Sequence, residues 1–257
     1  MSDNKILVHI PHSSVYIPEE YIGSFSADKD TVRQNLITLT DFSTDDLFNH
    51  PKHQNRLIFP VSRLLCDVER FEKDEDEIMA KVGMGVVYTH GVNGEVLRPY
   101  NSNFRAEIIE KYYRPHHDKL FQEVMSIINE NNCCVIVDAH SFPSKPVKYE
   151  LDQNPNRADF CIGTDDMHTP NSLVKVICNC IEGMGYKVEM NKPFSGTIVP
   201  LELYGIEVRV MSVMIEVNRR LYMDEVNQSR NEKYDTIKKD INRILDAIDE
   251  WITQKQK

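Results

Sequence analysis

Short apolar segments of strand length alternate along this chain with longer segments in which apolar residues recur at helical spacing. The clearest strand is expected at residues 133–143, where a run of apolar residues leads directly into Asp138, Ala139, His140 and Ser141. Strands separated by helices indicate a layered α/β fold, with helices on both faces of a sheet. Further strands are expected at 5–11, within 56–71, at 157–165 and within 208–223, and helices at 38–51, at 101–132 with a bend near Pro115, at 170–184 and at 224–255.

Nothing in the composition divides the chain. At 257 residues it is long for one domain, but α/β enzymes of this size are commonly undivided. There is no Gly/Ser linker, low-complexity stretch or internal repeat, so residues 1–257 are predicted to form a single domain. No apolar run approaches the length of about 18 residues that a membrane span needs, and the N-terminus lacks the pattern of a signal peptide. We therefore expect a cytoplasmic protein.

Charge and cysteine content disfavour some partners and sites. The net charge is -10, and an acidic surface repels phosphate backbones, so nucleic acid is not an expected partner. Without a membrane-spanning run, no membrane partner is expected either. An anionic small molecule stays compatible with this charge, because a pocket can be basic locally. The six cysteines form no CxxC pair, which favours buried, reduced thiols and argues against a Cys-ligated zinc site.

Three of the predicted strands end in ionisable residues. Active sites in open α/β sheets gather at the carboxyl ends of strands. We therefore expect these three ends to converge, although they are far apart in the sequence. They are Pro11-His12-Ser13-Ser14, Asp138-Ala139-His140-Ser141 and Glu216-Val217-Asn218-Arg219.

His12 and His140 are candidate imidazole ligands of a metal ion. Zinc hydrolases commonly combine two histidines with one carboxylate and leave a position for water. The carboxylate is expected from Asp41 or Asp45, which share one face of a predicted helix. Zinc bound there would lower the pKa of water to about 7, and Glu216 would serve as the general base. Zinc suits these ligands, although Mn, Co or Fe also occupies such sites.

Structural roles compete with these catalytic ones. Asp41 is also a candidate helix cap. Glu216 lies within an apolar strand, and a buried carboxylate without a partner is costly. In a purely structural interpretation, Arg219 and Arg220 are its partners.

Six short motifs follow one another along almost the whole chain. They are Pro11-His12-Ser13-Ser14 with Pro18, Thr40-Asp41 through Asp45 and Leu47, Ser62-Arg63 through Asp67 and Arg70, Tyr113-Arg114-Pro115-His116-His117, Asp138-Ala139-His140-Ser141, and Ile215-Glu216-Val217-Asn218-Arg219 with Leu221-Tyr222-Met223. Together they resemble the motifs of the N-formylglutamate amidohydrolase family. Ser14, His116 and the loop at 144–156 depart from the family pattern, and these departures concern the substrate more than the reaction.

The resemblance implies a fold similar to that of the zinc carboxypeptidases and aspartoacylases, here a single three-layer domain with a mixed sheet. It implies a zinc-dependent hydrolase that cleaves the amide C–N bond of N-formyl-L-glutamate or a related small-molecule N-acyl amino acid, releasing formate or another acid. It also implies His12, His140 and an early aspartate, Asp41 or Asp45, as ligands, with Glu216 near the reacting carbonyl.

Substrate carboxylates need cations, and the planar fork of arginine binds a carboxylate with two hydrogen bonds. Arg63 and Arg70 from the third motif and Arg219 are therefore expected to bind substrate, with Arg98 a further candidate. Ser141 is expected beside them. His117 is expected to polarise the carbonyl oxygen or stabilise the tetrahedral intermediate, or else to be an ordinary surface histidine.

Other functions fit the same residues. A carboxypeptidase-like enzyme or another N-acyl amino acid amidohydrolase keeps the fold and changes the substrate. A non-catalytic protein that binds small molecules keeps only the cleft. A serine hydrolase is disfavoured, because the chain has no G-x-S-x-G turn. The sequence does not indicate an oligomeric state.

Overall fold

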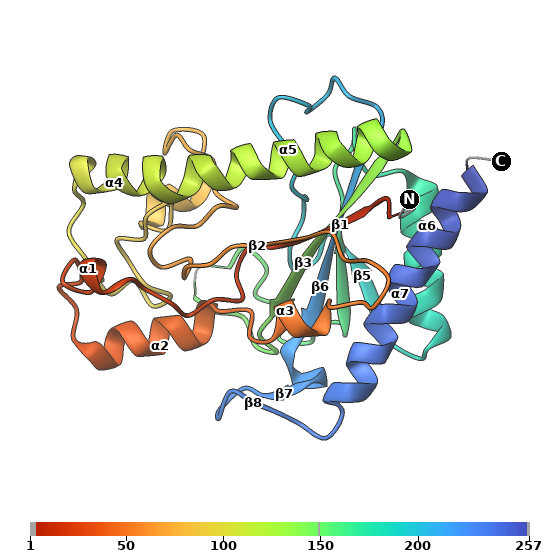
Figure 1. Ribbon diagram of the computed structural model, residues 1–257. Helices are drawn as coiled ribbons and strands as arrows, with labels where there is room; N and C mark the ends of the chain where they lie inside the picture. Colours follow the sequence, from red (N-terminus) through yellow and green to blue (C-terminus); the bar gives the residue numbers. More distant parts are fainter. Residues whose placement is uncertain (1–3, 149, 256–257) are drawn as a thin grey trace.

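The computed structural model describes residues 4–148 and 150–255 and is built on a mixed six-stranded sheet (Figure 1). The strand order is β2-β1-β3-β6-β4-β5, in which the first four strands are parallel and β4 runs antiparallel to β6. A second, two-stranded sheet pairs β7 with β8. The strands are β1 (Ile6–Ile10), β2 (Arg56–Ile58), β3 (Cys134–Phe142), β4 (Phe160–Gly163), β5 (Val188–Met190), β6 (Val210–Asn218), β7 (Met223–Asp224) and β8 (Ser229–Arg230).

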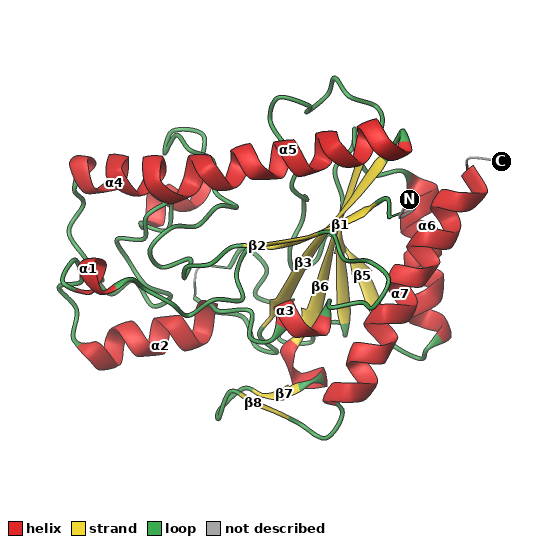
Figure 2. Ribbon diagram, in the orientation of Figure 1, coloured by secondary structure: helices red, strands yellow, loops and turns green. Residues whose placement is uncertain are grey.

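Helices cover both faces of the large sheet, so the predicted three-layer α/β fold is confirmed (Figure 2). Alternate residues of a strand point to opposite faces, and the two faces carry separate apolar clusters. On one face, Val8 packs with side chains of α3, α6 and α7; on the other, Leu7 packs with α5. The helices are α1 (Glu19–Ile22), α2 (Lys29–Leu39), α3 (Thr44–Leu47), α4 (Ser102–Ile108), α5 (Arg114–Asn131), α6 (Asn171–Gly183) and α7 (Tyr234–Lys255).

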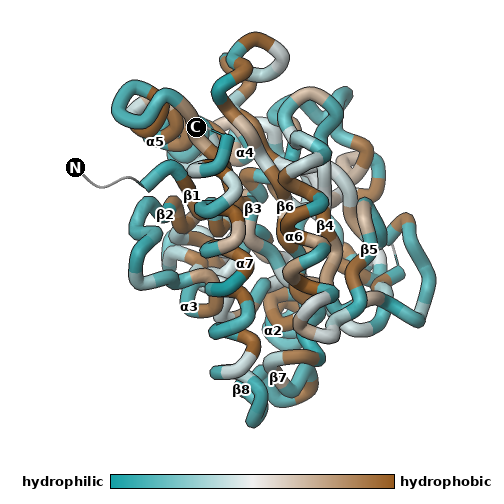
Figure 3. Tube along the Cα trace, turned by 90° about the vertical axis from the view of Figure 1, so that its right-hand side faces the viewer, coloured by the Kyte–Doolittle hydropathy of each residue, from teal (hydrophilic) through white to brown (hydrophobic). Residues whose placement is uncertain are grey.

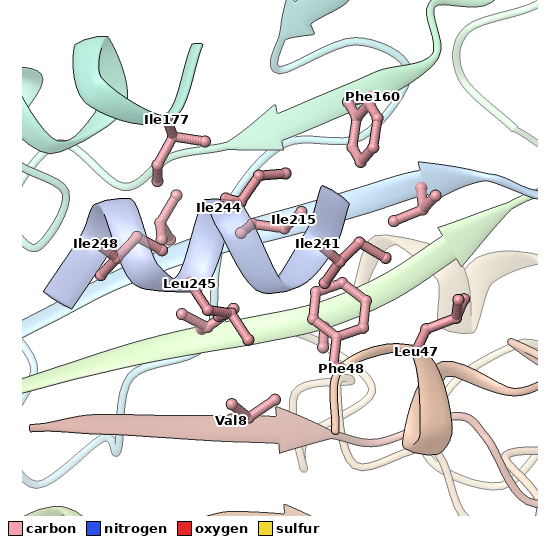
Figure 4. Close-up of a cluster of buried hydrophobic side chains, with 14 of the residues drawn as sticks. Val8, Leu47, Phe48, Phe160, Ile177, Ile215, Ile241, Ile244, Leu245 and Ile248 are labelled. Atoms are coloured by element: carbon pink, nitrogen blue, oxygen red, sulfur yellow. The ribbon is translucent and has the colours of Figure 1, made fainter. Parts of the chain in front are cut away.

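The largest core cluster lies between the sheet and α7. Ile241, Ile244, Leu245 and Ile248 recur along one face of this helix and are at most 2% exposed (Figure 4). The strands of the sheet are predominantly apolar along their length (Figure 3), as expected for strands covered on both faces.

Beyond the β2 edge of the sheet, α1, α2, α4 and the loops between β2 and α4 form a second packed region (Figure 1). It has apolar clusters of its own, one of which includes Leu39, Met84 and Val92. A short 3-10 helix, η1 (Ile78–Val82), lies in this region. Within the described ranges, no helix has the length and apolar character needed to cross a membrane.

Three predicted helices differ from those observed. The helix expected at 38–51 is only α3, because Thr40 is extended and Ser43 has a left-handed φ of 64°. The helix at 101–132 is continuous, and a π-helical turn at 109–113 lies directly before Pro115, which has no N–H to donate to the preceding turn. The C-terminal helix begins at Tyr234, because the β7–β8 hairpin occupies the start of the expected range.

The sheet order brings the polar strand ends together. β1 and β6 are the two neighbours of β3, and all three run parallel. His140 in β3 is in register with Glu216 in β6, and His12 follows the end of β1. The topology therefore confirms that these ends meet at one edge of the sheet.

Candidate metal centre and active site

Two imidazoles and one carboxylate converge at this edge. Nδ1 of His12 lies 3.3 Å from Nδ1 of His140, which in turn lies 3.2 Å from Oδ2 of Asp41. The distance from Nδ1 of His12 to Oδ2 of Asp41 is 3.8 Å. All three residues are buried, and their spacing suits a shared metal ion. We refer to them as the ligand triad.

The opposite side of each triad residue is held by a hydrogen bond. Nε2 of His12 lies 2.8 Å from Oδ1 of Asp67, and Nε2 of His140 lies 3.0 Å from Oδ1 of Asp138. A carboxylate only accepts hydrogen bonds, so these contacts place the proton of a neutral imidazole on Nε2 and leave the lone pair on Nδ1.

The triad is therefore electron-rich at its centre. Burial, followed by the charge of Arg63, lowers the pKa of His12 to about 4, so this ring stays neutral. Burial alone would lower the pKa of His140, but the Asp138 carboxylate raises it. When no metal is bound, a proton on His140 would reduce the repulsion among the three donor atoms. Two nitrogens and one carboxylate oxygen are the donor set that zinc prefers. The residues present fit a divalent cation.

The main chain explains why Asp41 belongs to the triad. Its N–H donates to the carbonyl of His12 (2.9 Å), and its carbonyl accepts hydrogen bonds from Thr44. Asp41 lies in the break between α2 and α3, and the cap position of α3 is Ser43 rather than Asp41. Asp45 is exposed on α3 and lies outside the triad.

Arg219 fixes the free oxygen of Asp41. Its Nη2 donates to Oδ1 of Asp41 (2.9 Å), its Nη1 to the carbonyl of Thr38 (2.7 Å) and its Nε to Oγ of Ser141 (3.2 Å). Arg219 and Ser141, both expected to bind substrate, therefore also orient the triad.

Glu216 lies in β6 without the arginine partners expected in a structural role. Arg219 bonds Asp41, and Arg220 donates to Asp159 (2.7 Å). Oε2 of Glu216 is buried and has no hydrogen-bond partner among the described residues. Burial raises the pKa of Glu216 to about 8. Such a carboxyl group can hold a proton near neutral pH.

A cavity of about 370 Å³ joins these groups. The triad and Glu216 line it, and so do four residues expected to bind substrate: Arg63, Arg70, Arg219 and Ser141. Its size suits a small molecule.

Comparison with known proteins decides the family. A sequence model of the family described as N-formylglutamate amidohydrolase matches residues 4–223. The chain belongs to the N-formylglutamate amidohydrolase family. No curated protein matches the chain.

Two solved structures share the fold of this family member. The crystal structure of N-formylglutamate amidohydrolase from Ralstonia eutropha JMP134 superposes with a TM-score of 0.84 at 22% identity, covering 97% of this chain and 94% of that one. A gene product from Agrobacterium tumefaciens superposes with a TM-score of 0.70 at 18% identity, covering 96% of this chain and 93% of that one.

Besides Asp45, two candidate residues of this family member, His117 and Arg98, lie outside the cavity lining. Nε2 of His117 lies 3.0 Å from the carbonyl of Val68, and the ring packs on Tyr113. Arg98 is buried, donates to the carbonyl of Leu64 and stacks over Phe25. In the described structure both contacts are structural.

The sequence interpretation overlooked the residue that holds His12. Asp67 is fully buried and accepts hydrogen bonds from His12, from Arg63 and, at 2.7 Å, from the hydroxyl of Tyr88. The signal was present, because Asp67 interrupts the apolar run Leu64-Leu65-Cys66 and Val68. Tyr88 has no comparable signal in the sequence.

Replacing Asp138 with Asn is expected to weaken zinc binding by about 10- to 100-fold. Oδ1 of Asp138 accepts from His140 and from Nδ1 of His9 (2.9 Å), and Oδ2 accepts from the N–H of Ile198 (3.2 Å). An amide cannot accept at both atoms, so the tautomer of His140 is no longer fixed. Competition with a chelating dye measures the affinity, and Asp165→Asn is the control. Equal affinities for Asp138→Asn and wild type would contradict the assignment.

The metal-free protein is expected to lose stability between pH 6.5 and pH 5. Burial, followed by the nearby charge of His9, lowers the pKa of His116 to about 2. The folded state therefore keeps this ring neutral, whereas the unfolded chain takes up a proton below about pH 6.5. Because the unfolded state binds more protons, the free energy of unfolding falls as pH falls. For this histidine the decrease is about 1.5 kcal/mol over the interval.

Urea unfolding at both pH values, with chelator present, checks this expectation. His116→Gln should reduce the pH-dependent loss by that amount, and His90→Gln should leave it unchanged. The same pH dependence in His116→Gln as in wild type would show that His116 is not the source.

Proposed function

We propose that this chain is a zinc-dependent amidohydrolase that cleaves the C–N bond of an N-acyl amino acid, N-formyl-L-glutamate or a related compound. The observation that carries the proposal is the ligand triad in one cavity with Glu216, a buried carboxyl group with an unpartnered oxygen. Family membership supports the amide bond as the target.

His12, Asp41 and His140 would hold the metal. When bound, it would polarise the substrate carbonyl and lower the pKa of water. The chain keeps these ligands in place through Asp67, Asp138 and Arg219, which leave one donor atom of each triad residue facing the centre.

Glu216 would move the proton. Its carboxylate takes a proton from the attacking water at Oε2, and the same group then donates that proton to the departing nitrogen. A raised pKa suits both steps, since the group must gain and lose a proton near neutral pH. Oε2 is buried, which favours return of the proton to the substrate over its loss to bulk water.

Arg63 and Arg70 would bind a carboxylate of the substrate. Both line the cavity on the side of Asp67, and neither bonds a triad residue. A carboxylate held there would place the acyl group toward the triad and Glu216.

The experiment is a product assay on the zinc-loaded protein. N-formyl, N-acetyl and N-succinyl derivatives of L-glutamate and L-leucine are supplied, and acid and free amino acid are measured together. Equal amounts of the two products, with one acyl class preferred, would support the proposal. No product from any compound would overturn it, and retained binding without turnover would favour a binding protein.

A further inference from the structure

One guanidinium group in the cavity lining, that of Arg70, has a buried nitrogen without a hydrogen-bond partner in the described ranges. Among the described residues that line the cavity, the guanidinium groups are those of Arg63, Arg70 and Arg219, and no lysine takes part. Arg219 is committed to Asp41. Arg63 and Arg70 remain, and both face one carboxylate, that of Asp67.

The contacts of this arginine pair are unequal. Arg63 donates to Oδ2 of Asp67 through Nε (3.1 Å) and Nη2 (2.7 Å). Nε of Arg70 lies 3.4 Å from the same oxygen and, although buried, has no hydrogen-bond partner in the described ranges. Asp67 also accepts hydrogen bonds from the hydroxyl of Tyr88 and the ring of His12, so its carboxylate has little room for a further hydrogen bond from Arg70. The pair therefore suits one additional carboxylate.

The acidic residues of the lining do not use this charge. Glu150 pairs with Arg157. Oε1 of Glu69 lies 3.3 Å from Nδ1 of His9, and within the described ranges neither Glu69 nor Glu216 forms an ion pair with Arg70. Neither acts as a standing counterion for Arg70.

The rest of the cavity has an apolar wall. Leu39, Met84 and Val92 are buried in one cluster, against which Met79 and Val147 pack, and all five line the cavity. Among the described residues that line the cavity, the arginines named above are the only cations. A second substrate carboxylate placed here would lose water without gaining a partner, which is unfavourable.

The rim continues the apolar wall into solvent. Ile78 is 58% exposed and Leu151 is 83% exposed, and both line the cavity. Leu151 lies in the loop at 144–156, which departs from the family pattern. A bulky apolar group in the cavity would cover these side chains.

We infer that the preferred substrate is an N-acyl amino acid with a single carboxylate and a bulky apolar side chain, rather than an N-acyl glutamate. The inference rests on the proposed amide hydrolysis. Arg63 and Arg70 bind the α-carboxylate, and the apolar wall receives the side chain. The acyl group then faces the triad and Glu216.

The first test compares N-formyl-L-leucine with N-formyl-L-glutamate by calorimetry on zinc-loaded Glu216→Gln protein, and by kcat/KM on wild type. N-formyl-L-leucine is expected to bind at least about tenfold more tightly than N-formyl-L-glutamate. Equal or tighter binding of the glutamate compound overturns the inference, and so does binding of neither. If neither compound is cleaved but the leucine compound binds preferentially, the proposed function fails and the inference about the ligand stands.

The second test adds a cation to the rim. Leu151→Arg should shift the binding ratio toward the glutamate compound by about fivefold. Leu201→Arg, at a position 64% exposed and outside the cavity lining, should leave the ratio unchanged. Arg70→Gln should weaken both compounds alike, by about tenfold. An unchanged ratio in Leu151→Arg, or unchanged affinities in Arg70→Gln, would count against the inference.

Discussion

The Glu216→Gln protein is expected to lose hydrolysis by about 10³-fold in kcat while still binding zinc. The amide keeps the shape of the side chain but cannot take a proton from water or return one to the departing nitrogen. Glu216 is not among the triad residues, so the ligands of the metal are unchanged. Stopped assays of product release, together with metal content, measure the two effects separately.

A matched control for Glu216 is Glu189, an exposed glutamate in β5. Glu189→Gln should retain wild-type turnover. Thermal unfolding of Glu216→Gln should show no loss of stability, because the substitution removes an acid whose buried Oε2 has no partner. If Glu216→Gln kept more than about a tenth of wild-type kcat, the loss would be too small for a residue that transfers the proton.

The second large effect is expected for the aspartate of the triad. Asp41→Asn should weaken zinc binding by more than about 100-fold, because loss of a ligand exceeds the usual cost of losing an outer partner. Its amide can still accept the hydrogen bond from Arg219, so the buried guanidinium keeps a partner. Equilibrium competition with a chelating dye gives the affinity.

The chain provides an internal control at Asp45. This residue belongs to the same sequence motif but is exposed on α3. Asp45→Asn should bind zinc as wild type does. If Asp45→Asn loses the metal and Asp41→Asn keeps it, the ligand assignment is wrong.

The sequence predicted the architecture of the site better than its details. Apolar strand segments ending in His12, His140 and Glu216 were sufficient to predict convergence, because parallel neighbouring strands place their carboxyl ends at one edge. No knowledge of the loops was needed for that step. The structure confirms the meeting of these ends in β1, β3 and β6.

The choice between Asp41 and Asp45 depended on the main chain. A helix across 38–51 would have put both carboxylates on one face. The left-handed conformation at Ser43 ends that regularity and separates the two side chains. A positive φ at a serine is uncommon and has no reliable signal in a single sequence.

Side-chain networks were the least predictable part. The ring nitrogens of His9 form hydrogen bonds to Asp138 (2.9 Å) and His116 (2.8 Å), although each of these residues is more than a hundred positions from His9 in the sequence. Nothing in the local pattern pairs them. Arg98 shows the converse, since an arginine considered for substrate binding is buried against Phe25.

Zinc titration of chelator-stripped wild-type protein, with product release followed at each step, tests the central claim most directly. We expect one zinc per chain at saturation, and turnover that rises in proportion to occupancy. Full turnover in the stripped protein, or zinc bound without any gain in turnover, would contradict a metal centre built from His12, Asp41 and His140.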